Sequence, residues 1–306
     1  MSQITSQTGA TPPTEGGAKP ANPVVPIVIS EISNIATLPE VTLKIIQLVE
    51  DPNSTAQDLN KVITHDPALG ARILKVVNSA FYGLPGQIGS INRAIVLLGL
   101  NAVKNIAIAA SLAKLFRGGQ ICESFSARDL WMHSIAVGTG TRLLAERAGL
   151  GLPDEAFLAG LIHDLGIMVE IQARRTQFIE AIALMDANPG MTMKEAETKT
   201  IGAHHEEFGA ALCKSWKFPS SFAYVTGFHH RPLEVAPLNR TLTSLVHVAD
   251  IIAADLEKPF DRDLETREIN PALLDQLKLT PEMVQEVKEA LPEAMEEALN
   301  LLQDGA

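Results

Sequence analysis

Apolar side chains recur at intervals of three and four residues over most of the chain, which is the spacing of one face of an α-helix. The segment VTLKIIQLVED (41–51) shows this pattern, and Pro52 ends it. Few stretches alternate apolar and polar residues with the period of two that a half-buried strand requires. The sequence therefore predicts an all-α protein without a substantial sheet.

Capping and breaking residues divide the first part of the chain into short helices. Asp66-Pro67 opens one helix, because proline is favoured at the first helical position, and we expect that helix to end at Gly83. Ser90 and Gly99 bound the next helix as its N-cap and its terminator. A long apolar helix is predicted over 100–116.

The 306 residues exceed one ordinary core, so we expect two subdomains. Residues 1–26 are rich in Gly, Pro and Thr and are predicted to form a disordered leader. Helical parts are then predicted at 27–120 and 121–258, followed by a C-terminal helical extension at 259–306. Within the second part, breaking residues separate helices predicted at 126–148, 154–170, 174–187, 192–214, 219–229 and 238–256.

Charge and cysteine content exclude several classes of function. The net charge is −11 and no Lys/Arg cluster offsets it, so no direct nucleic-acid partner is expected. Cys122 and Cys213 are the only cysteines, which argues against a disulfide framework or a cysteine zinc site. Without a bilayer-spanning apolar run or a signal segment, we expect a cytoplasmic protein with no membrane partner.

The second half of the sequence concentrates histidine. Each buried imidazole brings a donor and an acceptor that must be satisfied, so a core has little use for many of them. Imidazole and carboxylate together make a mixed site that suits iron, manganese, nickel or zinc. The alternative for any single position is a core histidine bonded to a backbone carbonyl, and spacing alone leaves both open. The candidates are His133, His163, His204, His205, His229, His230 and His247, with Asp129, Asp164 and Asp250 close to them in sequence.

Two pairs have informative spacing. Asp129 and His133 lie four residues apart, on one face of a helix. His163 and Asp164 are adjacent, about 100° apart around a helix, so both can reach one site only if the helix meets it edge-on.

The motifs that contain these residues resemble the metal-binding series of the HD superfamily, particularly its HD-GYP branch. They are His133, LIHDLG, HHEEFG, the later HH pair and VADIIAA. His205 is preferred to His204 because it begins a His-x-Glu-x-Gly pattern, and Asp129 falls where some HD-GYP proteins carry a bridging glutamate. The resemblance implies a mononuclear or dinuclear divalent metal site with the ligands His133, His163, Asp164, His205, His229, His230 and Asp250.

The first half narrows the resemblance to the HDOD family (HD-related output domain). The segments LPEVTLKIIQLVEDPNSTAQDLNKVITHDPALGARILKVVNSAFYG, INRAIVLLGLNAVKNIAI and HEEFGAALCKSWKFP carry it, and it covers about residues 27–255. It implies an HDOD fold with a helical N-terminal subdomain and an HD-like helical subdomain. It also implies a role in bacterial signal transduction, since HDOD proteins are generally viewed as non-enzymatic output or scaffold modules.

Two departures from HD-GYP phosphodiesterases bear on catalysis. Ile167 follows HDLG where those enzymes have lysine, and an apolar side chain cannot neutralise a phosphate. No Gly-Tyr-Pro motif follows HHEE. We therefore expect a non-catalytic regulatory module with a retained metal site, which binds a signalling protein partner or a nucleotide-type small ligand. The alternative is a metal-dependent phosphohydrolase acting on nucleotides or cyclic dinucleotides, with the lost lysine replaced by Arg93, Lys104 or Arg142.

The segment NSAFYGLPGQIGS offers one candidate surface for a partner. Phe81, Tyr82 and Leu84 form an exposed apolar patch in one interpretation. In the other, Phe81 and Tyr82 pack a helix end onto the second subdomain.

Overall fold

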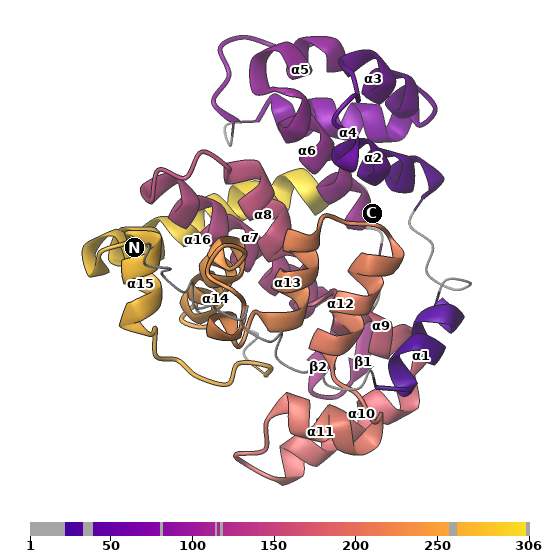
Figure 1. The fold of residues 1–306 in the computed structure, drawn as a ribbon, viewed down its shortest axis with the longest axis vertical. Coiled ribbons are helices and arrows are strands. Elements are labelled where there is room, and N and C mark those ends of the chain that lie inside the picture. Colours follow the sequence, from indigo (N-terminus) through magenta and orange to yellow (C-terminus); the bar gives the residue numbers. More distant parts are fainter. Residues whose placement is uncertain are drawn as a thin grey trace, which may run out of the picture.

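The computed structural model describes residues 22–32, 39–79, 82–113, 115–116, 119–256 and 262–303, and it confirms the all-α class (Figure 1). Over these ranges, the strands are limited to one short antiparallel hairpin of β1 (Gln120–Cys122) and β2 (Phe125–Ser126). The helices before the hairpin are α1 (Val24–Ile32), α2 (Glu40–Glu50), α3 (Ala56–Thr64), α4 (Pro67–Val77), α5 (Ile91–Leu98) and α6 (Leu100–Leu112). Those after it are α7 (Ala127–Arg147), α8 (Pro153–Ile162), α9 (Leu165–Ala173), α10 (Arg175–Ala187), α11 (Met193–Thr200), α12 (His205–Ser215), α13 (Ser220–Phe228), the 3-10 helix η2 (Pro232–Glu234), α14 (Thr241–Ala253), α15 (Pro271–Leu277) and α16 (Pro281–Gln303).

Helices α2 to α6 form the N-terminal subdomain, at the top of Figure 1. Helix α6 lies at its centre, and α2, α4 and α5 pack against it. Every residue of α6 from Val103 to Leu112 is buried, as its almost continuous apolar sequence requires. Ser90 caps α5 by accepting a hydrogen bond from the backbone N–H of Arg93, as predicted.

Helix α1 belongs spatially to the second subdomain, although it precedes the first in sequence. It packs against α9 and α12, at the lower right of Figure 1. It begins at Val24, inside the leader predicted for residues 1–26, because Val25, Val28 and Ile29 can be buried on that surface. Residues 1–21 lie outside the described residues, so the remainder of the leader stays a prediction.

The second subdomain is built around α7, which packs against α8, α14 and α16. Helices α7 and α8 approach closely at Gly160, where an added Cβ would lie 2.7 Å from the Cα of Gly138. Two predicted long helices are broken: the segment 154–170 divides at His163-Asp164, and the segment 192–214 divides at 201–204. Both breaks place a histidine of the candidate site at a helix end.

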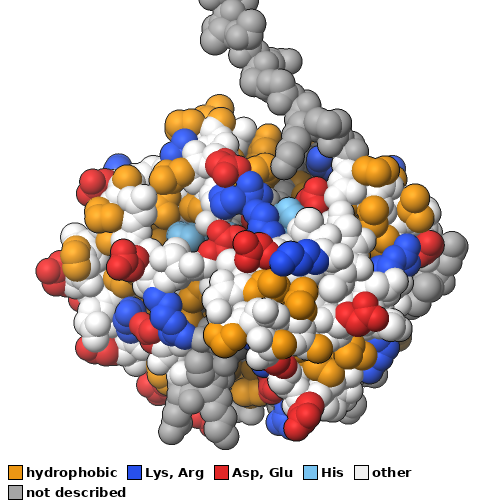
Figure 2. Space-filling view, turned by 90° about the horizontal axis from the view of Figure 1, so that it is seen from below, with side chains coloured by type: hydrophobic (Ala, Val, Ile, Leu, Met, Phe, Trp, Pro, Cys, Tyr) orange, Lys and Arg blue, Asp and Glu red, His pale blue; other side chains and the backbone are white. Residues whose placement is uncertain are grey.

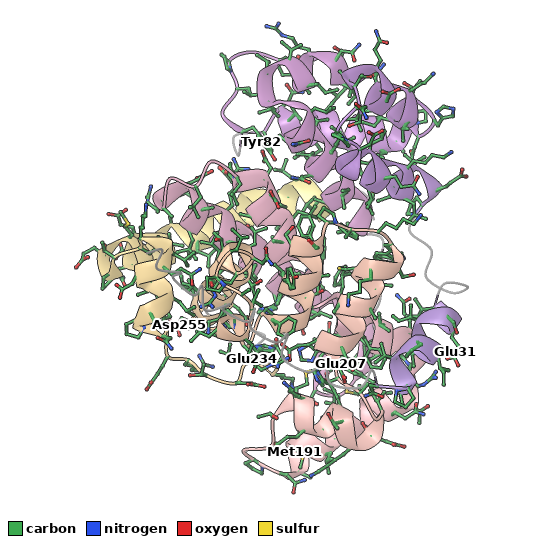
Figure 3. All side chains as sticks on the ribbon, in the orientation of Figure 1. Glu31, Tyr82, Met191, Glu207, Glu234 and Asp255 are labelled. Carbon is green, nitrogen blue, oxygen red and sulfur yellow. The ribbon has the colours of Figure 1, made fainter. Side chains whose placement is uncertain are left out.

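The two subdomains are joined by helices α8 and α16 and by Tyr82. Helix α6 packs on α8, and α16 contacts both α7 and α4. Tyr82 lies where the subdomains meet (Figure 3), and its hydroxyl donates a 2.7 Å hydrogen bond to Asp154, with the Arg142 guanidinium over its ring. The structure therefore supports packing rather than exposure for Tyr82, whereas Phe81 lies outside the described residues.

One stretch of the described chain, Pro153–Ala173, is long and apolar enough by composition to cross a membrane. It comprises α8 and α9, and 89% of its most apolar window is buried inside the protein. Its hydrophobicity is thus explained by its central position in the second subdomain.

Candidate metal centre

The turn between α8 and α9 presents two donors to one interior point. His163 ends α8 and Asp164 begins α9, so the two side chains do not need to share one helix. The Nδ1 atom of His163 lies 2.7 Å from the Gly160 carbonyl oxygen, and its Nε2 lies 3.2 Å from a carboxylate oxygen of Asp164. The expectation that one helix meets the site edge-on is therefore wrong; a helix break turns both residues inward.

Helices α7 and α14 supply His133 and Asp250. The Nε2 atom of His133 lies 3.2 Å from the Nε2 of His163 and 3.3 Å from a carboxylate oxygen of Asp250. Both side chains are about 1% exposed. The packing of α14 on α7 therefore joins parts of the sequence that are more than a hundred residues apart.

His205 enters the site at the first turn of α12. Its Nδ1 lies 2.8 Å from the Glu197 carboxylate, which also accepts a hydrogen bond from the His205 backbone N–H. The close approach of α9 depends on Gly166, because an added Cβ there would lie 1.8 Å from the His205 carbonyl oxygen. The glycine of the HDLG motif thus allows His163 and His205 to lie near each other.

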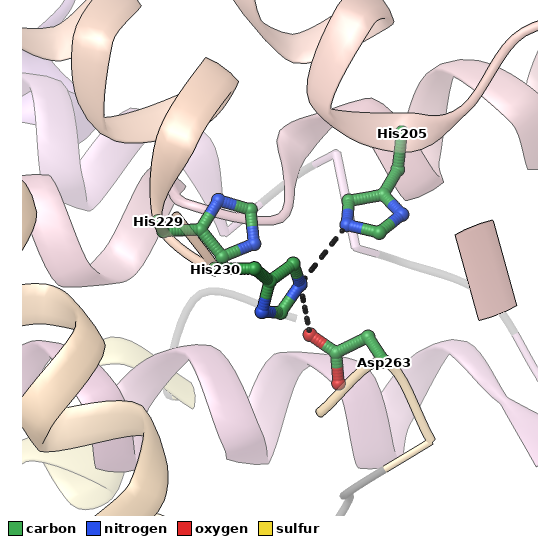
Figure 4. A group of neighbouring side chains, drawn as sticks. All are labelled: His205, His229, His230 and Asp263. Atoms are coloured by element: carbon green, nitrogen blue, oxygen red, sulfur yellow. Dashed lines mark hydrogen bonds and ion pairs between the residues drawn. The ribbon is translucent and has the colours of Figure 1, made fainter. Parts of the chain in front are cut away.

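The end of α13 contributes His229 and His230 (Figure 4). The Nδ1 of His229 contacts the Val225 carbonyl oxygen at 3.2 Å, and its Nε2 lies 3.4 Å from the second carboxylate oxygen of Asp164. The Nε2 of His230 lies 3.3 Å from that of His205 and 3.5 Å from a carboxylate oxygen of Asp263.

The donors form two neighbouring groups that each have the composition of a metal site. In each group, one ligand atom per residue can be chosen so that all lie within 4.8 Å of one another. Asp263 is common to both groups, and Asp164 lies between them because its two oxygens face His163 and His229. The groups are His133, His163, Asp164 and Asp263, and His205, His229, His230 and Asp263.

The donor atoms fit a cation better than they fit one another. His163, His205 and His229 each direct Nδ1 at an acceptor, so Nδ1 carries a hydrogen and Nε2 turns its lone pair inward. The buried carboxylate oxygens of Asp164 and Asp263 have no hydrogen-bond partner within the described structure. Two ligands about 2.0–2.1 Å from a tetrahedral ion are about 3.3 Å apart, which matches the separations between the Nε2 atoms.

Without a metal, protons take the place of the cation. Burial lowers the pKa of His163, but the Asp164 carboxylate outweighs burial and raises that pKa to about 9. Burial likewise opposes the charge of His205, yet Glu197 raises its pKa to about 10. Burial and the repulsion of Asp164 and Asp250 raise the pKa of Asp263 well above its usual range. Without a metal, the protons on His163 and His205 thus balance the Asp164 and Glu197 carboxylates, and the raised pKa of Asp263 favours its neutral form.

Seven of the eight predicted ligands come together: His133, His163, Asp164, His205, His229, His230 and Asp250. Asp129 does not join them. It is exposed in the first turn of α7, where its backbone N–H donates to the Ser126 hydroxyl. Spacing placed Asp129 on the face of His133, but the helix N-terminus favours a solvated carboxylate in its first turn.

Sequence reasoning missed Asp263 and Glu197. Asp263 lies in a segment of low apolar content that gives no motif, and its side chain is fully buried. Glu197 reads as a surface residue of a polar helix, although it is 0% exposed. One available signal was the break at 201–204 between α11 and α12. It lets the chain turn so that the Glu197 side chain faces His205.

The remaining two candidate histidines lie beside the centre. Burial and the neighbouring His205 lower the pKa of His204 to about 4, so it is neutral near pH 7. His247 donates from Nδ1 to the His229 carbonyl oxygen at 2.7 Å and so supports the end of α13. Neither belongs to the two donor groups.

The predicted replacements for a catalytic lysine lie elsewhere. Lys104 is buried in the N-terminal subdomain, where it donates to the Leu48 carbonyl and the Ser54 hydroxyl. Arg142 binds Asp154 at the junction of the subdomains, and Arg93 is exposed on α5.

Two other cations lie at the rim of the centre. Lys194 and Arg231 both pair with the buried carboxylate of Glu206, at 3.2 and 3.1 Å. Figure 2 shows histidine side chains at the surface among acidic and basic side chains. The rim is therefore charged but internally paired.

The structure is that of an all-helical protein with a buried cluster of histidines and carboxylates, and a comparison with sequence families gives the particular family. The HDOD domain profile matches residues 35–232, and the chain belongs to the HDOD family. An uncharacterized protein of Treponema pallidum (strain Nichols) is 26% identical over 220 residues, which are 70% of this chain and 42% of that protein. The chain thus spans about two fifths of the length of this relative.

Solved structures from three bacteria share the fold. An HDOD domain protein of unknown function from Geobacter sulfurreducens has a TM-score of 0.73 at 23% identity, covering 90% of this chain and 98% of its own. A Shewanella amazonensis protein with the provisional name of a phosphohydrolase has a TM-score of 0.68 at 24% identity, covering 90% and 98%. A Marinobacter aquaeolei protein named provisionally for signal transduction has a TM-score of 0.72 at 22% identity, covering 91% and 64%.

Proposed function

We propose that this protein is a signalling module of the bacterial cytoplasm, in which a buried centre holds one or two divalent metal ions without turning over a substrate. The observation that carries the proposal is the contrast between a full donor set and a rim where, among the residues that the structure describes, the two neighbouring cations are already paired with Glu206. Ile167, fully buried on α9, is apolar, and Lys194 and Arg231 are both occupied by Glu206.

The metal would be held by residues in or at the ends of six helices and in one loop. A bound divalent ion would supply positive charge to the buried carboxylates, which burial otherwise makes costly. The mixed imidazole and carboxylate donors suit iron, manganese, nickel or zinc rather than magnesium or calcium. Because α7, α9, α12 and α14 each bring at least one ligand, metal occupancy is coupled to the packing of the whole subdomain.

A cleft next to the centre is the proposed site for a small ligand. It has a volume of about 570 Å³, and its lining includes the polar side chains of His230, Arg231 and His247 and the apolar side chains of Ile269 and Leu273. This volume falls in the range of small-molecule sites. A nucleotide-type ligand would place a polar group beside His230 and an apolar part against Leu273, and a signalling protein partner would respond to the occupied state.

The donor series also supports a second candidate, a metal-dependent phosphohydrolase acting on nucleotides or cyclic dinucleotides. Nearly all the ligands of the HD type are present, and the Shewanella amazonensis neighbour carries the provisional name of a phosphohydrolase. In such an enzyme a metal lowers the pKa of a bound water and clamps phosphate oxygens. Turnover of a phosphoester by the metal-loaded protein would favour this candidate.

Elemental analysis of the purified protein tests the proposal. We expect near-stoichiometric iron, manganese, nickel or zinc in the wild type and in a His65→Ala control, whose histidine is exposed at the end of α3. The His163→Ala and Asp164→Ala variants should each bind metal at least about 10–100-fold more weakly. Folding is checked by circular dichroism, because Asp164→Ala also leaves histidines without a partner. Folded wild type without metal, or unchanged metal in both variants, would contradict the proposal.

A further inference from the structure

Asp263 adds a carboxylate to a group of three histidines that would otherwise leave one coordination position of a metal ion open. In the group formed by α12 and α13, His205, His229 and His230 supply three imidazole donors. Three histidines leave one position of a tetrahedral ion for water or substrate, as in catalytic zinc sites. Here Asp263 supplies the fourth donor (Figure 4).

The placement of Asp263 is that of a buried ligand rather than a surface acid. Its side chain is 0% exposed, and one carboxylate oxygen lies 3.5 Å from the Nε2 of His230. Neither oxygen has a hydrogen-bond partner within the described structure. A buried carboxylate without a hydrogen-bond partner is costly, and a cation held between it and the histidines would remove that cost.

The segment that carries Asp263 follows the region matched by the family profile. The match ends at residue 232, whereas Asp263 lies between α14 and α15. The same segment continues to Ile269 and Leu273, which line the cleft beside His230. The C-terminal part of the chain thus contributes both the fourth donor of the site and one wall of the cleft next to it.

We propose that Asp263 is a built-in ligand that occupies the coordination position where water or a phosphate would otherwise bind. This inference rests on the proposed metal centre and explains why that centre would hold metal without catalysis. Structural metal sites are closed by four protein ligands, while catalytic sites keep one position open. Removing Asp263 should therefore convert a closed site into an open one.

Cobalt-loaded protein and inorganic phosphate provide the test. Visible absorption of bound Co²⁺ reports the number and kind of its ligands, and metal content is measured first on every sample. For wild type and for Glu265→Gln, a nearby exposed acid with the same charge change, phosphate should leave the spectrum unchanged. For Asp263→Ala at saturating Co²⁺, phosphate should produce a saturable change in the spectrum. The phosphate concentration at half-saturation should be at least ~10-fold lower than for any response of the wild type.

The outcomes separate this inference from the proposal on which it rests. A wild type that binds no metal overturns both. A metal-loaded wild type that responds to phosphate as Asp263→Ala does, or a metal-loaded Asp263→Ala that does not respond, overturns only the role of Asp263. If Asp263→Ala does not fold, Asp263→Asn keeps the side-chain volume and is expected to respond at higher phosphate concentrations, because a neutral amide is a weaker ligand.

Discussion

Metal binding is expected to tighten steeply as the pH rises, because the ligand histidines hold protons when no metal is bound. Asp164 overcomes the effect of burial and raises the pKa of His163 to about 9, and Glu197 does the same for His205, to about 10. Near pH 7 the inward Nε2 atom of each imidazole therefore carries a proton. A metal ion can bind only after displacing both.

The size of the effect follows from these pKa values. Displacing a proton at pH 7 costs about 3 kcal/mol from His163 and about 4 kcal/mol from His205, since one pH unit corresponds to about 1.4 kcal/mol. Two protons released per metal bound give a slope of about 100-fold in affinity for each pH unit between about 7 and 8.

Competition with a chelator of known protonation constants measures this slope. A Glu197→Gln variant loses the charge that raises the pKa of His205, so its slope should fall to about 10-fold per pH unit. A His65→Gln variant, altered at an exposed and distant histidine, should keep the wild-type slope. An affinity that does not change between about pH 7 and pH 8 would refute the reasoning.

The raised pKa values of His163 and His205 also predict how the stability of the metal-free protein depends on pH. Both pKa values are raised above the unfolded value near 6.5, so the stability from His163 and His205 is fully present below about pH 6.5. It is lost as the pH rises through about 9 and 10. Urea denaturation of metal-free protein should thus show a midpoint that decreases over this range, while stabilisation by metal increases.

Three further predictions concern single side chains. Gly166→Ala should cost at least about 1–3 kcal/mol of stability and weaken metal binding, since its Cβ would lie 1.8 Å from a backbone carbonyl oxygen of α12. Gly89→Ala, with open space around it, should change neither the stability in a denaturation experiment nor the affinity in a metal titration. Burial and Glu197 raise the pKa of Glu170 well above its usual range, so Glu170→Gln should keep the melting temperature and the metal content at pH 7. A large loss of melting temperature or metal would show that Glu170 is ionised. Tyr82→Phe should cost about 1 kcal/mol in urea denaturation without loss of metal, because it removes the hydrogen bond to Asp154 and keeps the packed ring. A loss of metal would show that the subdomain junction controls the centre.

Tertiary contacts decided several features that local pattern did not show. The periodicity over 154–170 is that of one helix, yet the chain turns at His163-Asp164, and this turn directs both side chains at the same centre. Helix α1 joins the second subdomain because its apolar face is buried on α9 and α12. The spacing of residues in the sequence predicts neither the helix break at His163-Asp164 nor the placement of α1.

The sequence alone determined the helical class and the family, and it located seven of the residues that the fold brings together, because helical periodicity is local and the motifs keep their order along the chain. Only the tertiary structure decided which carboxylates complete the centre. Asp129 had the better spacing but lies exposed at a helix N-terminus, whereas Asp263, in a segment without a motif, is buried against His230. A ligand is defined by where its oxygen atoms lie in space, and for a residue on an irregular segment that position depends on the packing of helices distant in sequence.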